Sequence, residues 1–236
     1  MNKYVVIVAG GKGLRMGGDL PKQFIPMRGK PLLMHTLETF YRWDASVRVV
    51  LVLPEAHQAY WRMLCEEIGC QVPHAVVNGG EARFFSVKQG LDWIIHKESM
   101  DGKKGLADCL IAVHDGVRPF VAPEVISSCF ERAASTKAAI PVVPLVDSLR
   151  EKDENGSHPV DRSRYIAVQT PQVFDGALLQ EAYRQPYSPR FTDDASVVEA
   201  LGYTIDTVPG NRENIKITTP FDLRVAEALF NSEAYE

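Results

Sequence analysis

The sequence contains few cysteines and no long apolar run. Its four cysteines, Cys65, Cys70, Cys109 and Cys129, form neither a CxxC pair nor a cluster with histidines at zinc-ligand spacing, which argues against a zinc site and a disulfide framework. We expect reduced thiols that pack as small hydrophobic side chains. The first apolar run, residues 4–9, is too short to span a membrane and lacks the cleavage site of a signal peptide. These absences predict a cytoplasmic protein with no membrane partner.

A strong excess of one charge is also missing. The formal net charge of −4 provides no global basic field, which argues against nucleic acid as a partner. The contents of hydrophobic residues (45%), charged residues (24%) and aromatic residues (9%) are those of an ordinary globular protein and argue against disorder and collagen-like repeats. A chain of 236 residues can bury a sizeable core, and we expect a single domain over residues 1–236.

The sequence does contain short β-branched runs that alternate with segments of helical period. This alternation is typical of a parallel sheet with helices on both faces, so we predict an α/β fold with a single doubly wound, mostly parallel sheet. Thr219, Pro220 and Asp222 resemble a capped helix start and predict a final helix. The predicted strands cover residues 4–9, 47–53, 72–77, 109–113, 138–143 and 203–208.

Two stretches interrupt this pattern. Residues 98–108 are polar and contain glycine, which predicts an exposed loop. Residues 144–169 form a segment that is too long for a simple connection. It carries many charges, and in places apolar and polar residues alternate along it. We predict that they form a protruding β-arm, because long excursions from a compact domain usually have a function.

A glycine-rich turn, residues 10–18 (GGKGLRMGG), follows the first predicted strand, at the edge where α/β sheets bind ligands. Its glycines let backbone amides approach a phosphate closely. The turn is not a Walker A loop, and a dinucleotide fingerprint would need glycine where Met16 stands. Arg15 and Lys22 lie nearby in the sequence and suit a polyphosphate with its departing pyrophosphate. A structural turn with two solvated surface cations is the simpler alternative.

Five separated motifs carry a family resemblance. They are residues 9–16 (AGGKGLRM) with 21–23 (PKQ), 79–87 (GGEARFFSV), 113–119 (VHDGVRP), 169–172 (QTPQ) and 214–218 (NIKIT). In this order, over nearly the whole chain, they resemble the 2-C-methyl-D-erythritol 4-phosphate cytidylyltransferases. The resemblance implies that the 4-phosphate of methylerythritol phosphate attacks the α-phosphorus of CTP and releases pyrophosphate, a step in non-mevalonate isoprenoid synthesis. Mg²⁺ is the expected cofactor, because it accompanies triphosphates and prefers oxygen ligands.

The resemblance also implies roles for individual residues. Arg15 and Lys22 would stabilise the transition state on the triphosphate. The implied nucleotide pocket consists of Ala9, Gly10, Gly11, Gly13, Gly80, Glu81, Arg83 and Ser86. The implied polyol-phosphate site consists of Asp115, Arg118, Ser148, Arg162, Thr170 and Lys216. For Arg83, a salt bridge that holds the loop is an equally open alternative.

Three of these positions can be argued further. Asp115 follows the predicted strand 109–113, so its carboxylate faces the ligand edge and either holds Mg²⁺ or accepts a hydrogen bond from a substrate hydroxyl. His114 is expected to be structural, because a phosphate monoester dianion needs no general base. Lys216 lies in an alternating, strand-like run and is predicted to point out of the core toward the substrate phosphate.

A homodimer is implied as well. In the resembled family the segment that matches the arm reaches a second subunit, where Ser148 and Arg162 would hold the sugar phosphate. The family commonly has threonine at the position of Ser148, and many relatives have two alanines where this chain has Gly116 and Val117. An ion pair between Arg162 and Asp161 within the arm is the alternative.

Three other functions remain open. A ribitol-5-phosphate cytidylyltransferase would share the scaffold and most of the phosphate-binding residues. A dinucleotide-dependent oxidoreductase would need an acidic residue at the end of the second strand, where residues 53–55 (LPE) fit poorly. A catalytically silent nucleotide-binding module is disfavoured, because both Arg15 and Lys22 are present.

Overall fold

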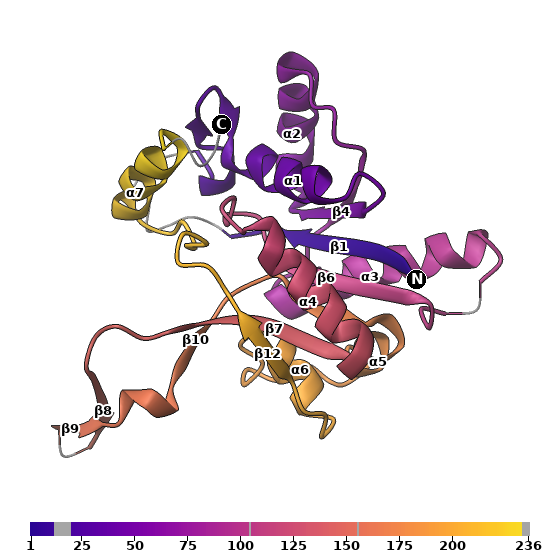
Figure 1. Ribbon diagram of the computed structural model, residues 1–236. Helices are drawn as coiled ribbons and strands as arrows, with labels where there is room; N and C mark the ends of the chain where they lie inside the picture. Colours follow the sequence, from indigo (N-terminus) through magenta and orange to yellow (C-terminus); the bar gives the residue numbers. More distant parts are fainter. Residues whose placement is uncertain (12–19, 104, 155, 233–236) are drawn as a thin grey trace.

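The computed structural model describes residues 1–11, 20–103, 105–154 and 156–232. Within them, an eight-stranded sheet has the order β10-β7-β11-β6-β1-β4-β5, with β12 paired to β7. Helices cover the sheet, and a hairpin projects away from the body (Figure 1). The predicted α/β fold with a doubly wound, mostly parallel sheet is therefore confirmed.

The predicted strands all occur in this sheet. They are β1 (Asn2–Val8), β4 (Arg48–Leu53), β5 (His74–Asn78), β6 (Cys109–Asp115), β7 (Ala138–Pro144) and β12 (Asp206–Pro209). β1 pairs in parallel with β4 and β6, β4 with β5, and β7 with β12. The largest difference from the prediction is at the last strand, where residues 203–205 lie outside β12.

Two further strands of the sheet were not predicted. β11 (Gln172–Asp175) runs antiparallel between β6 and β7, and β10 (Ile166–Val168) runs antiparallel to β7. They have four and three residues, which is too short for a recognisable period-2 pattern. The end of the predicted arm, residues 166–168, therefore belongs to the central sheet.

The helices are α1 (Leu32–Trp43), α2 (Glu55–Ile68), α3 (Arg83–Met100), α4 (Pro123–Thr136), α5 (Gly176–Ala182), α6 (Asp194–Glu199) and α7 (Pro220–Phe230). A short two-stranded ribbon, β2 (Pro26–Met27) and β3 (Lys30–Pro31), precedes α1. α7 begins as predicted, because the Thr219 side chain caps it and Asp222 completes a capping box. α3 continues to Met100, so the predicted loop 98–108 begins three residues too early. None of the helices in the described ranges is long and apolar enough to cross a membrane.

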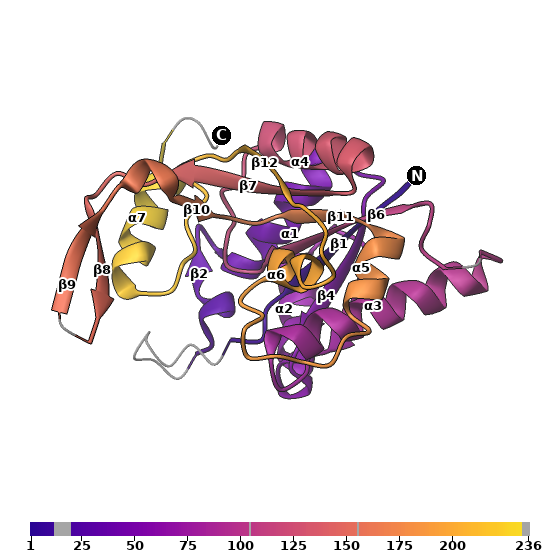
Figure 2. The same cartoon turned by 90° about the horizontal axis from the view of Figure 1, so that it is seen from below.

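Strand side chains alternate between two apolar layers. On β1, Val5 and Ile7 join the layer formed with α1 and α4, whereas Tyr4 and Val6 join the layer formed with α3 and α5. Figure 2 shows α4 and α1 on one side of the sheet and α3 and α5 on the other. Because both faces are covered, the strand is apolar at consecutive positions rather than alternating.

The arm is a β-hairpin that carries little apolar packing of its own. β8 (Leu149–Asp153) and β9 (Gly156–Val160) pair antiparallel, and the short helical turn η3 (Arg162–Arg164) follows. Between residues 145 and 168, none of the described residues is buried. Val146 is 61% exposed and Ile166 51%. The predicted protruding β-arm is confirmed, with residues 145–165 as its extent outside the sheet.

A buried carboxylate explains why α3 extends beyond its predicted end. Glu98 is fully buried and accepts hydrogen bonds from the Tyr4 hydroxyl (2.6 Å) and the Asn2 amide (2.9 Å), and it forms ion pairs with Arg48 (2.9 Å) and Lys103 (2.8 Å). Burial disfavours its charge, but the hydrogen bonds from Lys103, Tyr4 and Asn2 outweigh burial and lower the pKa of Glu98 to about 2.

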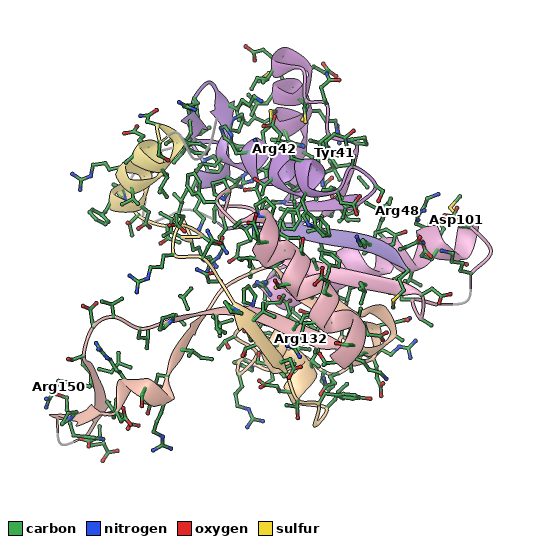
Figure 3. All side chains as sticks on the ribbon, viewed as in Figure 1. Tyr41, Arg42, Arg48, Asp101, Arg132 and Arg150 are labelled. Atoms are coloured by element: carbon green, nitrogen blue, oxygen red, sulfur yellow. The ribbon has the colours of Figure 1, made fainter. Side chains whose placement is uncertain are left out.

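This cluster ties the last turn of α3 to the start of the parallel strands. Arg48 also approaches Asp101, at 3.7 Å, and Figure 3 shows these two side chains together near the N-terminus of the chain, far from the arm with Arg150. The cluster therefore lies at the opposite end of β1 from the glycine-rich turn, and it is a stabilising element rather than part of a ligand site.

Replacing Glu98 by glutamine should weaken the fold in a pH-dependent way. A carboxyl group with a lowered pKa stabilises the folded state above its ordinary pKa of about 4.5, and this contribution is lost as the pH falls toward 2. We expect Glu98→Gln to lower the free energy of unfolding by about 1–3 kcal/mol at pH 7, with a smaller difference at pH 3. Urea unfolding at both pH values measures this. The exposed Glu131, changed to glutamine, is the control, and equal effects of the two changes would contradict the prediction.

Candidate active site

A cavity of about 230 Å³ lies at the carboxyl ends of β1 and β6. This is the edge at which parallel α/β sheets bind ligands. The predicted site residues that line the cavity are Ala9, Gly10, Gly11, Lys22, Gly80, Glu81, Arg83, Ser86, Asp115 and Lys216. The structure thus brings together residues from four of the five sequence motifs, whereas Arg15 and Gly13 lie outside the described residues.

The start of the glycine-rich turn and Lys22 lie against each other. A Cβ atom on Gly11 would lie 3.2 Å from Lys22 Cε and 3.5 Å from Lys22 Nζ. The ammonium group of Lys22 therefore lies beside the backbone of Gly11. An ammonium group and glycine backbone without side chains, on one wall of a cavity, suit the binding of a polyphosphate.

Helix α2 holds the turn that carries Lys22. The turn η2 (Lys22–Phe24) packs its Phe24 ring edge-on to Tyr60, with ring centroids 5.2 Å apart, and parallel to Trp61 at 6.3 Å. Gln23 is buried in the cavity wall, and its amide nitrogen lies 3.3 Å from His57 Nδ1. Gln23 could not be predicted as a wall residue, because its burial depends on packing against a helix more than 30 residues away.

The second glycine motif forms another wall. A Cβ on Gly80 would lie 2.4 Å from the Cβ of Phe85, so glycine is required there for the close approach of loop and helix. The backbone N–H of Gly80 donates to the Ser86 hydroxyl oxygen at 3.1 Å. Ser86 thereby fixes the loop that carries Glu81 into the cavity wall.

Asp115, the last residue of β6, is surrounded by three cations. Its carboxylate lies 3.0 Å from Arg118 Nε, 3.1 Å from Lys216 Nζ and 3.9 Å from Arg83 Nε. Burial alone would raise the pKa of Asp115, but the positive charges of the three side chains hold the pKa well below its usual range. The carboxylate stays ionised and holds Arg83 and Lys216 at the cavity, whereas Arg118 is not among the described residues that line it.

Arg83 also makes the salt bridge that the sequence analysis left open. Its Nη1 atom lies 2.7 Å from Oδ1 of Asp194, which is fully buried and also accepts a hydrogen bond from the Tyr183 hydroxyl at 2.6 Å. The structural alternative for Arg83 is thus confirmed, and the same side chain still lines the cavity. Asp194 was not among the predicted site residues, since no motif connects it to Arg83 in the sequence.

Asp194→Asn should destabilise the protein through Arg83. Asparagine keeps the shape and both hydrogen bonds but removes the charge that faces the partly buried guanidinium group of Arg83, so we expect a loss of about 2 kcal/mol in the free energy of unfolding. Chemical denaturation measures this loss. Asp206→Asn is the matched control, because Asp206 faces the exposed Arg132 at 3.8 Å and such surface pairs contribute less than about 1 kcal/mol. Equal losses in both variants would contradict a special role for Asp194.

His114 has a structural environment, as predicted. Its Nε2 lies 3.0 Å from the carbonyl oxygen of Arg118 and its Nδ1 lies 3.0 Å from the Thr170 hydroxyl. Because a carbonyl only accepts, Nε2 carries the proton and Nδ1 accepts from Thr170. Burial lowers the pKa of His114 to about 4. Thr170 does not reach the cavity wall but accepts from the backbone N–H of Asp115 at 3.2 Å, so it orients that residue.

Lys216 reaches the cavity from an irregular segment, and the predicted strand-like run is wrong. Residues 214–218 form no strand, because their described backbone hydrogen bonds are two local ones, from Asn214 to Asn211 and from Ile215 to Glu213, and one to a distant residue, from Ile217 to Val117 (3.1 Å). Asn214 is fully buried, and its amide donates to the carbonyl oxygen of Thr170 at 2.8 Å. Its backbone carbonyl accepts from Arg118 at 2.7 Å. These bonds place Lys216 beside Asp115.

Ser148 and Arg162 do not join the other predicted site residues. Both are exposed on the arm, and neither is among the described residues that line the cavity. Arg162 donates a hydrogen bond to the carbonyl oxygen of Val146. Asp161 accepts from the backbone N–H of Ser163 (3.0 Å) and from its hydroxyl (2.7 Å), so the proposed ion pair of Arg162 with its neighbour is not found in the described part of the arm.

The fold and the cavity together define a class of protein. Gly10 and Gly11 at the end of β1, Lys22 beside Gly11, and Lys216 beside Asp115 line one cavity at the carboxyl edge of a doubly wound sheet. This is the arrangement of a nucleotidyltransferase-like enzyme, in which two anionic substrates meet.

Comparison with known proteins identifies the family. The family model of 2-C-methyl-D-erythritol 4-phosphate cytidylyltransferase matches residues 3–232, and the chain belongs to this family. A cytidylyltransferase of this name from Phocaeicola vulgatus is 55% identical over 229 residues, with 97% of this chain and 100% of the relative covered. One from Bacteroides thetaiotaomicron is also 55% identical, with the same coverage.

Solved structures agree with this assignment. The enzyme of the same name from Francisella tularensis is 30% identical and superposes with a TM-score of 0.77, covering 97% of this chain and 99% of that one. The Thermus thermophilus enzyme is 31% identical, with a TM-score of 0.73 and coverage of 98% and 100%. The chain is therefore a CTP-dependent nucleotidyltransferase that acts on 2-C-methyl-D-erythritol 4-phosphate in isoprenoid precursor synthesis.

Proposed function

We propose that the cavity is where the 4-phosphate of 2-C-methyl-D-erythritol 4-phosphate attacks the α-phosphorus of CTP. The observation that carries this proposal is the presence of two cationic walls on one cavity, Lys22 at the glycine-rich turn and Lys216 at Asp115. Two mutually repelling anions need such walls to come into line. No covalent enzyme intermediate is required.

The glycine-rich turn and Lys22 bind the triphosphate. Glycine backbone N–H groups are well suited to bind phosphates, and the Lys22 ammonium group neutralises the charge that develops as pyrophosphate leaves. Arg15 is proposed as the second cation of this wall.

The loop with Gly80 and Glu81, fixed by Ser86, is proposed to hold cytosine and ribose, because rigid backbone groups distinguish a pyrimidine from a purine by size and hydrogen-bonding pattern.

The cations around Asp115 are proposed to bind the polyol phosphate. The Lys216 side chain is 43% exposed and reaches into the cavity, whereas the Arg118 side chain is 12% exposed and directs its guanidinium group to Asp115. Asp115 holds both cations in place before the substrate arrives, so little reorganisation is needed on binding. An oxygen of its carboxylate is also available to accept a hydrogen bond from a substrate hydroxyl.

A resident magnesium site at Asp115 does not fit these residues. The carboxylate faces three cationic side chains, and the described residues contain no group of three or more histidine, cysteine or acidic side chains that would hold a metal. Mg²⁺ remains the proposed cofactor, with the triphosphate oxygens of CTP as its principal ligands.

The arm supports the proposal of a homodimer. It contains no buried residue among those described, its apolar side chains Val146 and Tyr165 are 61% and 46% exposed, and it projects away from the body (Figure 1). Apolar surface of this kind is typical of a segment that packs against another chain. Ser148 and Arg162 would then complete the polyol-phosphate site of the partner subunit.

The proposed location is the cytoplasm, the compartment where both substrates of such a biosynthetic step are expected. Its support is that all four cysteines are free thiols, which is the usual state of cysteine in a reducing compartment. Imaging the protein with a fluorescent tag inside cells would test this proposal, and fluorescence outside the cytoplasm would contradict it.

A pyrophosphate-release assay tests the reaction. CTP, UTP, ATP and GTP are each combined with 2-C-methyl-D-erythritol 4-phosphate or ribitol 5-phosphate. We expect the highest kcat/KM for CTP with the methylerythritol substrate. A higher value with ribitol 5-phosphate would support the alternative cytidylyltransferase, and no release with any pair would indicate a silent nucleotide-binding module.

A further inference from the structure

Two of the four cysteines meet at the end of α2. The helix ends at Gly69, whose φ of +74° lies in the left-handed region. The backbone N–H groups of Gly69 and Cys70 both donate to the carbonyl oxygen of Cys65, at 3.0 and 2.9 Å. In such a helix ending the residue after the glycine folds back over the start of the last turn, and the two side chains come into contact. The end of α2 therefore brings the side chains of Cys65 and Cys70 together.

This contact makes the two thiols chemically different. The neighbouring Cys65 thiol and the backbone N–H of Val72 lower the pKa of Cys70, although burial opposes this shift. The neighbouring Cys70 and burial raise the pKa of Cys65. Cys70 therefore has the larger thiolate fraction of the two, and the thiolate is the nucleophilic form of cysteine.

The other two cysteines lack both features. Cys65 and Cys70 are partly exposed, whereas Cys109 and Cys129 are buried. Burial raises the pKa of Cys109 to about 11 and that of Cys129 to about 12. Buried, protonated thiols react slowly with solutes, so they serve as internal controls.

We infer that Cys65 and Cys70 form an oxidisable dithiol that hydrogen peroxide converts into an intramolecular disulfide. The Cys70 thiolate attacks a peroxide oxygen, so that an S–O bond forms, the O–O bond breaks and the departing oxygen leaves as water after taking a proton from solvent. The Cys65 sulfur then attacks the Cys70 sulfur, the S–O bond breaks, and hydroxide leaves with the Cys65 proton as a second water. The peroxide is reduced and the two thiols are oxidised, and a dithiol reductant reverses the change.

The backbone allows this bond to form without rearrangement. A disulfide needs Cα atoms no more than about 7 Å apart. The hydrogen bond from the Cys70 backbone N–H to the Cys65 carbonyl, at 2.9 Å, keeps the two residues within that range.

Mass spectrometry of the intact enzyme tests the inference. The reduced protein is treated with hydrogen peroxide at pH 7 and then alkylated under denaturing conditions. We expect two alkylated cysteines, Cys109 and Cys129, instead of four. Tryptic digestion should release residues 63–83 with an internal disulfide, and cleavage after Glu66 or Glu67 should split this peptide into two disulfide-linked parts. Four alkylated cysteines after peroxide treatment, or a disulfide that joins other cysteines, would overturn the inference.

Single substitutions assign the two roles. Cys65→Ser should stop at a sulfenic acid on Cys70, which dimedone traps, and Cys70→Ser should yield about fivefold less trapped product on Cys65 because that thiol is mostly protonated. Cys129→Ala is the control and should form the disulfide at the wild-type rate. Equal trapping in both serine variants would contradict Cys70 as the attacking residue. None of these readouts depends on cytidylyl transfer, so they can succeed or fail independently of the proposed function.

Discussion

Lys22→Ala is expected to lower kcat by about 10² to 10³, which corresponds to about 3–4 kcal/mol of transition-state stabilisation. Lys22 lines the cavity and its ammonium group lies beside the backbone of Gly11, where pyrophosphate would depart. Charge on the leaving group grows during the reaction, so the contact strengthens in the transition state and affects kcat more than KM. Steady-state pyrophosphate release, with CTP and the polyol phosphate varied in turn, measures both constants.

Thermal unfolding separates this effect from a loss of structure. Lys22 is partly exposed on a short turn, so its replacement should change the free energy of unfolding by no more than about 0.5 kcal/mol. Lys97→Ala is the matched control, because Lys97 on α3 pairs with Asp101, just after the helix, at 3.1 Å, and Lys97 does not line the cavity. It should retain wild-type turnover. An equally active Lys22→Ala enzyme would remove Lys22 from the catalytic role, and the same measurement on Arg15→Ala tests its proposed partner.

The sequence alone predicted the parts of the fold that local pattern determines. β1 and β6 are apolar at consecutive positions because both faces of the sheet are covered, and such runs are recognisable without a structure. The start of α7 was predicted for a similar reason, since a capping box and a proline depend on neighbouring residues alone. The short strands β10 and β11 were missed because they are strands only through their pairing with β6 and β7.

The site was predictable where its residues lie in motifs and unpredictable where they act through other residues. Lys22, Asp115 and Lys216 each belong to a motif, and the structure places all three on one cavity. Asp194 lies 111 positions from Arg83 and pairs with it only after α6 has packed near α3. Such long-range contacts leave no local pattern in a single sequence. The role of Asp115 was unpredictable for the same reason. Whether its carboxylate suits a metal ion or a substrate hydroxyl depends on the charged side chains around it, and these come from distant parts of the sequence.

Mixing two inactive variants should restore activity if the arm completes the site of a neighbouring subunit. Lys22→Ala removes a cavity residue and Arg162→Ala removes an arm residue, and each homodimer should be nearly inactive. In a mixed dimer, one site combines the intact cavity of the Arg162→Ala chain with the intact arm of the Lys22→Ala chain. Random exchange makes half of all dimers mixed, so recovery should approach about a quarter of wild-type activity. The observation behind this expectation is an exposed hairpin that carries Arg162 away from the cavity of its own chain.

A second mixture tells a shared site from simple stabilisation by the partner. Lys22→Ala mixed with Lys216→Ala places both defects in cavities, so every mixed dimer has a damaged cavity at each site and should stay inactive. Native mass spectrometry of the two mixtures shows whether subunits have exchanged. Recovery only in the mixture with Arg162→Ala means that Arg162 acts in the partner's site, because no other arrangement rebuilds an intact set of residues. Absence of recovery despite proven exchange would mean that Arg162 serves its own chain, or that it only holds the arm together through its bond to Val146.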